Sequence, residues 1–354
     1  LDGGWGEILL AQGVDPSFIP DLDGDTLVLT DPVTGEDTVI HHVIGPGYEI
    51  VRIEGTDGND IIEVIVDGPS ITYVDGGAGD DIIEGSSEAD ILVGGTGDDI
   101  INGYEGNDWL HGGAGNDTLD GGAGEDLVVG GGQNDILYGD TGTDQIYGNG
   151  GNDYLYGNDG QDWLYGGNGN DVLNGGAGYL DYVYGGEGND VLIADDADYL
   201  HGGDGDDTYQ LGVNSNAEII IRRGEGHDVV ELSSGSHFIS FQASIGMHDL
   251  FYERNANDLT LHILGEDQSV LLKNFFASGV SARIKVPYLA LIGIDDTSAG
   301  MANVMAAYDA NLLPDLGNLT DEQLGERYDW ITSNYGPLYV RLNAVDSFND
   351  AVVY

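Results

Sequence analysis

Aliphatic side chains recur at every ninth position through the middle of the chain. The repeated positions are Ile83, Leu92, Ile101, Leu110, Leu119, Val128, Leu137, Ile146, Leu155, Leu164 and Leu173. Side chains alternate across a strand, so a three-residue strand with its middle residue inward, followed by a six-residue turn, explains the spacing. Two nonapeptides then make one coil of 18 residues. The pattern predicts an all-β fold, a right-handed parallel β-roll solenoid.

Aspartate and glycine keep the same frame, which reads Gly-Gly-x-Gly-x-Asp-x-aliphatic-x and is cleanest at residues 112–120 and 166–174. Glycine reaches the positive-φ conformations of tight turns that other residues reach only with strain. The aspartates at sixth position are Asp81, Asp90, Asp99, Asp108, Asp117, Asp126, Asp135, Asp144, Asp153, Asp162 and Asp171. The frame therefore predicts glycine-rich turns that carry one aspartate each.

Acidic residues dominate this block. The chain has 354 residues, with 9 Lys+Arg against 64 Asp+Glu and a formal net charge of -55. No basic residue lies between Arg52 and Arg222, and residues 53–221 hold 36 Asp+Glu. Nucleic acids and anionic lipids are bound by clustered Lys and Arg, so this charge argues against both as partners. A disordered acidic tail would not keep a nine-residue frame, and a folded acidic repeat is predicted.

A hard divalent cation explains the repeated aspartate. Ca²⁺ takes about 6 to 8 oxygen ligands from carboxylates and backbone carbonyls. In a coil of 18 residues, aspartates 18 apart stack beside the carbonyls of the turns. Pairing the eleven regular aspartates at that distance gives 11 - 2 = 9 sites between successive turns, so about nine or more Ca²⁺ ions are expected. The alternative, in which each aspartate only caps its own turn, leaves stacked carboxylates that would repel one another.

The frame resembles that of the RTX family, the haemolysin-type calcium-binding nonapeptide-repeat exoproteins of Gram-negative bacteria, over about residues 55–232. The resemblance implies a β-roll that folds on binding Ca²⁺, export through a type I channel, and a secreted, extracellular or cell-surface location. It implies that the sixth-position aspartates bind calcium. With a looser fit to the frame, it extends to Asp60, Asp181, Asp190, Asp198, Asp207 and Asp228. The loops 85–90 and 140–144 lack turn glycines, so weak or empty sites are expected there.

The flanks have a different character. Alternating runs between residues 237 and 290 predict strands, which we interpret as a cap on the last coil. We divide the chain into an N-terminal β cap at 1–53, the β-roll at 54–232, a β-rich C-terminal cap at 233–290 and a tail at 291–354.

The tail is expected to be helical. Residues 297–312 and 320–335 read as helices, the second with a capping box at Thr320 and Gln323. The last residues, 349–354, are similar to the uncleaved secretion signals of type I substrates; a short terminal strand would give the same string. No segment has the roughly 18 apolar residues of a membrane-spanning helix.

Outward positions of the middle coils are rich in aromatic residues. They are Tyr147, Trp163, Tyr165, Tyr182 and Tyr184 on one sheet, and Tyr138, Tyr154 and Tyr156 on the other. Aromatic residues fit pleated surfaces. The alternative is a docking face for a glycan, for another chain, a second copy included, or for the other domains of the same precursor.

Searches for catalytic motifs find none, so this segment is not expected to be an enzyme. The chain has neither an initiating Met nor a signal peptide, and it reads as a piece of a larger precursor. The sequence thus predicts a secreted calcium-binding module that supports type I export, with the type I secretion apparatus and an upstream domain of the same precursor as partners. The upstream domain is expected to be an enzyme, toxin or adhesin. The alternative is a structural surface protein or adhesin that self-assembles or binds glycans in a calcium-dependent way.

Overall fold

A computed structural model describes residues 21–23, 26–28, 39–44, 50–66, 71–178, 180–242, 245, 249–263, 265–277, 280–285 and 342–343. All regular elements among these residues are β-strands. No helix in this part of the chain is long and apolar enough to cross a membrane. The chain divides into two compact units, Leu1–Gly186 and Glu187–Tyr354.

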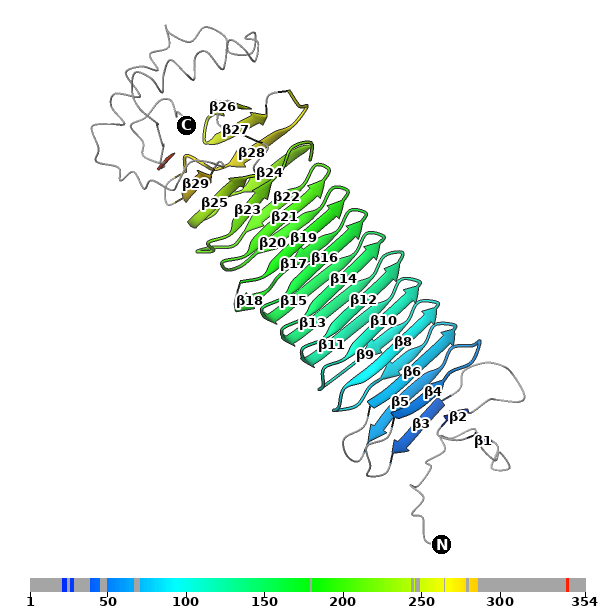
Figure 1. Ribbon diagram of the computed structural model, residues 1–354. Helices are drawn as coiled ribbons and strands as arrows, with labels where there is room; N and C mark the ends of the chain where they lie inside the picture. Colours follow the sequence, from blue (N-terminus) through cyan, green and yellow to red (C-terminus); the bar gives the residue numbers. More distant parts are fainter. Residues whose placement is uncertain are drawn as a thin grey trace, which may run out of the picture. The chain divides into compact units, whose positions relative to one another are not determined.

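The first unit is built from two sheets whose strands alternate along the chain (Figure 1). One sheet has the order β1(Asp21–Asp23), β2(Thr26–Val28), β4(Ile50–Glu54), β6(Ile71–Ala78), β8(Asp90–Thr96), β10(Trp109–Ala114), β12(Leu127–Gly132), β14(Gln145–Gly150), β16(Trp163–Asn168), β19(Tyr182–Glu187). The other has the order β3(Val39–Ile44), β5(Ile61–Val66), β7(Ile82–Glu84), β9(Ile100–Asn102), β11(Thr118–Gly124), β13(Ile136–Gly142), β15(Tyr154–Gly160), β17(Val172–Asn174), with β18(Ala177–Gly178) beside β15. The pairs are parallel, apart from β1 with β2.

The repeated aliphatic residues form the core of this unit. Leu110 pairs with Val128 and Val128 with Ile146, so each coil advances the register by 18 residues. All eleven repeated aliphatics, from Ile83 to Leu173, are fully buried. In the nonapeptide repeat each strand contributes one buried aliphatic side chain, so the apolar core is a single column from each sheet. The predicted parallel β-solenoid is confirmed.

The second unit continues the alternation with a less regular register. One of its sheets contains β21(Tyr199–Asp204), β23(Glu218–Ile221), β25(Gly235–Phe241), β29(Val280–Lys285) and β30(Leu342–Asn343). The other contains β20(Val191–Ala194), β22(Thr208–Leu211), β24(His227–Glu231), β28(Ser269–Lys273), β27(Asp258–Ile263) and β26(Leu250–Asn255). Val191 pairs with Thr208 and Thr208 with Val229, steps of 17 and 21, as the loosened aspartate spacing predicted.

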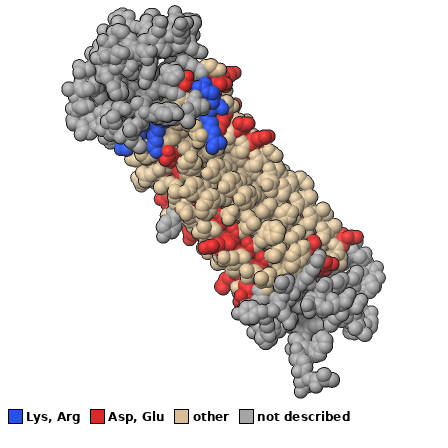
Figure 2. Space-filling view, viewed as in Figure 1, with Lys and Arg blue, Asp and Glu red and all other residues tan. Residues whose placement is uncertain are grey.

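Antiparallel pairs and ion pairs distinguish the second unit. β26, β27 and β28 form an antiparallel meander within it. Figure 2 shows Lys and Arg side chains on this unit. They are paired locally: Lys273 Nζ lies 2.7 Å from Glu231, Lys285 Nζ 2.8 Å from Glu218, and Arg223 3.2 Å from Asp249. The predicted helices at 297–312 and 320–335, and the segment 349–354, lie outside the described residues.

The outward aromatic residues stack in columns on the first unit. Tyr147 and Tyr165 are 4.8 Å apart between ring centroids, and Tyr165 and Tyr184 are 5.0 Å apart, with nearly parallel planes. Trp163 stacks on Tyr182 at 5.4 Å, and a further pair, Tyr138 and Tyr156, lies on the other sheet at 5.1 Å. Tyr165 thus has a stacked ring on each of its two faces, which leaves mainly its edge toward solvent.

Candidate metal sites

The predicted site residues form buried ladders of aspartates at the turns. One ladder of the first unit contains Asp60, Asp81, Asp99, Asp117, Asp135, Asp153 and Asp171, and the other contains Asp90, Asp108, Asp126, Asp144, Asp162 and Asp181. The second unit holds Asp190, Asp198, Asp207 and Asp228. None of these side chains is more than 3% exposed. Seventeen carboxyl groups are therefore buried. The sequence has no Lys or Arg between Arg52 and Arg222 to neutralise them.

Backbone amides connect the rungs of each ladder. The amide of Asp81 donates to Oδ1 of Asp99 at 2.8 Å. The same bond, at 2.8 to 2.9 Å, joins all nine aspartate pairs that the sequence placed 18 residues apart. It also joins Asp60 to Asp81 at 2.7 Å and Asp162 to Asp181 at 2.9 Å. The looser positions at both ends of the repeat thus enter the ladders of the first unit.

The same bond is present in the second unit. The amide of Asp190 donates to Oδ1 of Asp207 at 2.8 Å, and that of Asp207 to Oδ1 of Asp228 at 3.2 Å. Asp198 is also fully buried in this unit. Its backbone carbonyl accepts a hydrogen bond from the Glu218 amide at 2.7 Å.

The second carboxylate oxygen, Oδ2, has no hydrogen-bond donor in most rungs. These orphaned and buried oxygens belong to Asp81, Asp99, Asp108, Asp117, Asp126, Asp135, Asp144, Asp153, Asp162 and Asp207. A buried polar atom without a partner destabilises the fold by about 1–3 kcal/mol, and by more when it is charged. So many in regular array indicate that a partner of opposite charge belongs beside them.

Burial raises the pKa of these carboxyl groups, and neighbouring carboxylates add to the rise at several rungs. The pKa is raised to about 7 at Asp99, Asp108, Asp135 and Asp144, and to about 6 at Asp81, Asp117, Asp126 and Asp162. At Asp207 and Asp228 it is raised to about 8. The ladder amides lower these values but do not offset burial. A bound cation would reverse the effect, because it favours the ionised form.

A carbonyl oxygen of the next turn stands beside the orphaned carboxylate oxygen at six rungs, those of Asp81, Asp99, Asp108, Asp144, Asp153 and Asp162. Above Gly103, the point where a Cβ atom would stand lies 2.5 Å from Asp108 Oδ2 and 2.5 Å from the carbonyl oxygen of Gly121. At Gly139 the two distances are 2.6 Å to Asp144 Oδ2 and 3.0 Å to the carbonyl of Gly157. The two oxygens, which come from successive turns, therefore face the same small space beside the glycine, and carboxylate and carbonyl oxygens are the ligands that Ca²⁺ takes.

The donor set fits a hard cation held by one or two carboxylates and backbone carbonyls. No group of three or more His, Asp or Glu side chains within the described residues converges on a metal, so the remaining ligands must come from the backbone. Glycine is required at these places because any side chain would fill the space between the two oxygens. The aspartates and turn carbonyls would hold Ca²⁺, which would supply the positive charge that the ladders lack.

The two loops that depart from the frame behave differently. In the loop 140–144, Asp140 adopts a φ of 69° and Gly142 one of 150°, so the turn keeps its left-handed positions without the usual glycine. Aspartate tolerates the left-handed region, so this turn has the backbone conformation of the regular turns, and the expectation of a weak or empty site there stays a prediction. In the loop 85–90 no residue has positive φ, and the amide of Ser86 donates to Asp90 Oδ2 at 2.7 Å.

A second, outer ladder escaped the sequence analysis. The residue before each aspartate on one edge is Asn or Asp: Asn59, Asp80, Asp98, Asn116, Asn134, Asn152 and Asn170. The Asn116 amide donates to Asp98 Oδ1 at 2.7 Å, and the Asn134 amide donates to Asn116 Oδ1 at 3.2 Å. The signal was present as Asn or Asp at 18-residue intervals. The opposite edge has Ala89, Asn107, Glu125, Thr143, Gln161 and Leu180 at this position, and there Asn107 accepts the same bond, from the Glu125 amide at 3.1 Å, so the Asn/Asp column is continuous on one edge and interrupted on the other.

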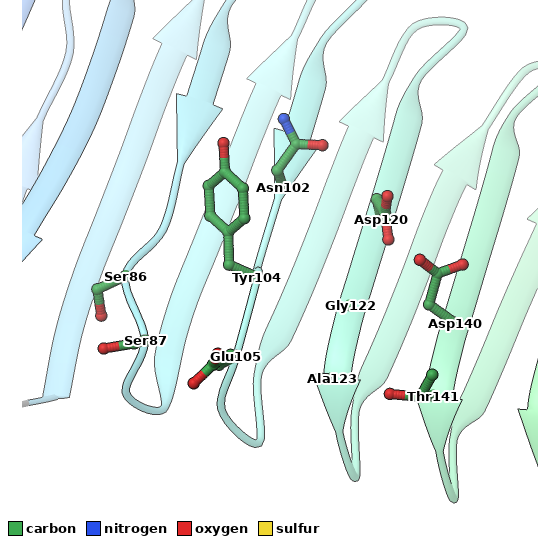
Figure 3. Close-up of a pocket in the computed structure, with 10 residues that line it drawn as sticks. All are labelled: Ser86, Ser87, Asn102, Tyr104, Glu105, Asp120, Gly122, Ala123, Asp140 and Thr141. Atoms are coloured by element: carbon green, nitrogen blue, oxygen red, sulfur yellow. The ribbon is translucent and has the colours of Figure 1, made fainter.

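A cavity of about 550 Å³ lies along the second edge (Figure 3). Its lining includes Tyr104, Asp120 and Asp140. Burial and the charge of Asp140 raise the pKa of Asp120. The cavity offers acidic and hydroxyl groups, and within the described residues no group of three or more carboxylates that could hold a metal lies there.

A family model for the RTX calcium-binding nonapeptide repeat matches the chain at residues 75–110, 84–119, 102–137, 111–146, 120–155, 147–179 and 180–209. Residues 75–209 are RTX calcium-binding repeats. RTX repeats of this kind are typical of secreted exoproteins. No curated protein matches the chain.

Among solved structures, the chain matches the extracellular lipase LipA from Serratia marcescens, at 16% sequence identity and a TM-score of 0.22. The match covers 59% of this chain and 38% of the lipase. At that similarity, the RTX repeats are identified by their own motif and geometry, and nothing about the lipase's activity follows.

Replacing Asn116 by Ala tests the outer ladder. The variant loses the acceptor for the Asn134 amide and the 3.0 Å bond from Asn116 Nδ2 to Asp98. Both bonds are exposed, so we expect stability to fall by about 1 kcal/mol and the number of bound calcium ions to stay unchanged. Thermal unfolding in saturating Ca²⁺ and calorimetric titration measure the two quantities. Loss of an ion in this variant would show that the outer ladder shapes the metal sites.

Proposed function

We propose that this chain is a calcium-dependent folding module of a secreted protein, and that it supports type I export of a larger exoprotein. The observation that carries the proposal is the array of buried carboxylate oxygens without donors, six of which lie beside a carbonyl of the next turn. These oxygens destabilise the roll without a cation and would ligate one when it is present. Metal binding and folding then become one equilibrium.

The two compartments of an exported protein differ in free calcium. Inside the cell, where free Ca²⁺ is scarce, the acidic block stays an extended polyanion that a channel can thread. Outside, Ca²⁺ at about 10⁻⁴ to 10⁻³ M is enough for extracellular calcium modules to bind. Nine Ca²⁺ would add +18 to the -36 of residues 53–221, which reduces the repulsion that keeps the chain extended. Folding outside would also oppose movement back through the channel.

The first test is a Ca²⁺ titration of the full chain, followed by far-UV circular dichroism and small-angle scattering. We expect a cooperative change from coil to β-structure near millimolar Ca²⁺, with compaction to a monomer. Mg²⁺ at equal concentration is the control, and it should fail because it demands octahedral geometry and dehydrates reluctantly. A spectrum that does not change with Ca²⁺ would sink the proposal, and a transition that ends in large particles would favour surface assembly instead.

The stacked aromatic columns favour packing over glycan binding. A sugar stacks on an open ring face, whereas the faces of Tyr165 are covered by Tyr147 and Tyr184 at 4.8 and 5.0 Å. We propose that these columns stiffen the sheet. We also propose that the catalytic or binding activity of the precursor, which is no part of this module, resides in the upstream domain.

A further inference from the structure

The first turn of each ladder differs from all the turns that follow it. The turn 55–60 opens one ladder, with Asp60 as its first aspartate, and the turn 85–90 opens the other with Asp90. Thr72 stands at the register position before Asp90, where a further rung would require an aspartate. Within the described residues of the first unit, both ladders thus begin at a turn of the same unusual kind.

In these two first turns, a hydroxyl and an amide donate to the aspartate Oδ2, the oxygen that has no donor in most of the later turns. The Ser86 amide and hydroxyl donate to Asp90 Oδ2 at 2.7 and 2.9 Å. The Thr56 amide and hydroxyl donate to Asp60 Oδ2 at 2.5 and 3.0 Å. Each hydroxyl oxygen also accepts the amide two residues later, from Glu88 or Gly58, at 3.2 Å. At Asp90, Oδ2 therefore accepts both bonds from Ser86, and Oδ1 is the carboxylate oxygen without a donor within hydrogen-bond distance.

Backbone conformation separates these two turns from the later turns of the first unit. In the eleven later turns, the residue at the position of Thr56 and Ser86 has positive φ. These residues are Gly77, Gly95, Tyr104, Gly113, Gly122, Gly131, Asp140, Asn149, Asn158, Gly167 and Gly176. Thr56 and Ser86 do not have positive φ, and Thr is β-branched and disfavours that region. Figure 3 shows the turn of Ser86 and Ser87 beside the left-handed turn of Tyr104 and Glu105.

We propose that Thr56 and Ser86 are caps: each occupies the aspartate of the first turn of its ladder with hydrogen-bond donors, so that this turn forms without a bound metal. This inference rests on the proposed calcium-binding function. The turns 55–60 and 85–90 hold no Ca²⁺, because two local donors saturate the carboxylate oxygen that ligates the ion in the following turns. Of the nine sites counted from the sequence, the one that pairs Asp90 with Asp108 is therefore lost.

The caps give each ladder a start that does not depend on calcium. Ser86 and Asp90 are only four residues apart, so the capped turn closes a short loop and loses little chain entropy. The Asp90 amide can then donate to Asp108 Oδ1, as it does at 2.8 Å, and so presents the first rung to the next turn. Calcium is needed from the second turn onward.

Two matched pairs of variants test the inference by calorimetric titration of the full chain with CaCl₂. We expect Asp60→Asn and Asp90→Asn to leave the number of bound ions unchanged. Their partners one coil further on the same ladders, Asp81→Asn and Asp108→Asn, should each lose at least one ion. Equal loss at capped and uncapped positions would overturn the inference. A parent chain that binds no Ca²⁺ would instead overturn the proposed function, which separates the two failures.

A second pair of variants tests the cap at Ser86 by thermal stability alone. Ser86→Ala removes the hydroxyl donor, whereas Ser87→Ala changes an exposed neighbour in the same turn. We expect a Tm lower by several degrees for Ser86→Ala only, in saturating Ca²⁺ or in any condition where the parent is folded. Equal Tm values for the two variants would show that the Ser86 hydroxyl does not cap the first turn of its ladder.

Discussion

In calcium-free buffer, lowering the pH from 8 to 5 is expected to restore β-structure that the chain lacks at pH 8. Burial raises the pKa of eight ladder carboxyl groups of the first unit from an ordinary value of 3.8 to about 6 or 7. At a pH between 3.8 and the raised pKa, these carboxyl groups are protonated in the metal-free roll and ionised in the unfolded chain. Protons can therefore neutralise the ladders in place of calcium.

The sign of the effect follows from linkage between proton binding and folding. A carboxyl group whose pKa is raised in the folded state stabilises the metal-free fold at low pH, fully below about pH 4. That stabilisation is lost as the pH rises through about 6 and 7. One pKa unit corresponds to about 1.4 kcal/mol, so a carboxyl group shifted to about 7 destabilises the ionised roll by about 4 kcal/mol. A few such groups exceed the roughly 5–15 kcal/mol that holds an ordinary domain together.

The measurement is far-UV circular dichroism of the full chain at a series of pH values, in buffer freed of calcium by a chelating resin. With calcium the dependence should reverse, because protons compete with the ion for carboxylates: the Ca²⁺ concentration at the folding midpoint should rise as the pH falls. β-structure at pH 8 without calcium would show that the ionised ladders are tolerated, and the electrostatic argument would fail.

The fold was predictable because one column of aliphatic residues determines the register. Leu110, Val128 and Ile146 must all point inward, and a shift by one residue would turn the whole column toward solvent. The sequence spacing also predicted the rungs, down to the pairs that share an amide–carboxylate bond. The irregular steps of the second unit were visible in the aspartate spacing, from Asp181 onward, although the sequence could not show which strands would pair there.

The caps and the outer ladder were harder to predict, for two different reasons. Asn116 belongs to an exposed column that a search for buried chemistry passes over, although its 18-residue period was available. Ser86 was seen only as a missing glycine. Whether a turn residue donates to its own aspartate depends on the sign of φ, and serine is compatible with either kind of turn. Asp140 shows the converse, since a residue other than glycine keeps the left-handed turn.

Replacing Gly103 by Ala is expected to remove one calcium site and destabilise the loaded roll. The new Cβ would lie 2.5 Å from both Asp108 Oδ2 and the backbone carbonyl oxygen of Gly121, closer than Cβ atoms approach other atoms. The backbone of two successive turns must separate to admit it. Such overpacking costs about 1–3 kcal/mol, and the loss of the ion adds to this. Calorimetric titration with CaCl₂ counts the ions, and thermal unfolding in saturating Ca²⁺ measures the loss of stability.

Gly150 provides the matched control for this variant. It also lies in a glycine-rich segment of the first unit, yet a Cβ there would meet only the Gly131 carbonyl at 4.0 Å, and its φ is not in the left-handed region. We expect Gly150→Ala to bind the parental number of ions with a Tm close to that of the parent. If the two variants behave alike, the space above Gly103 is not the place where the oxygens of successive turns converge on calcium. Gly103 would then be required only for the shape of its turn.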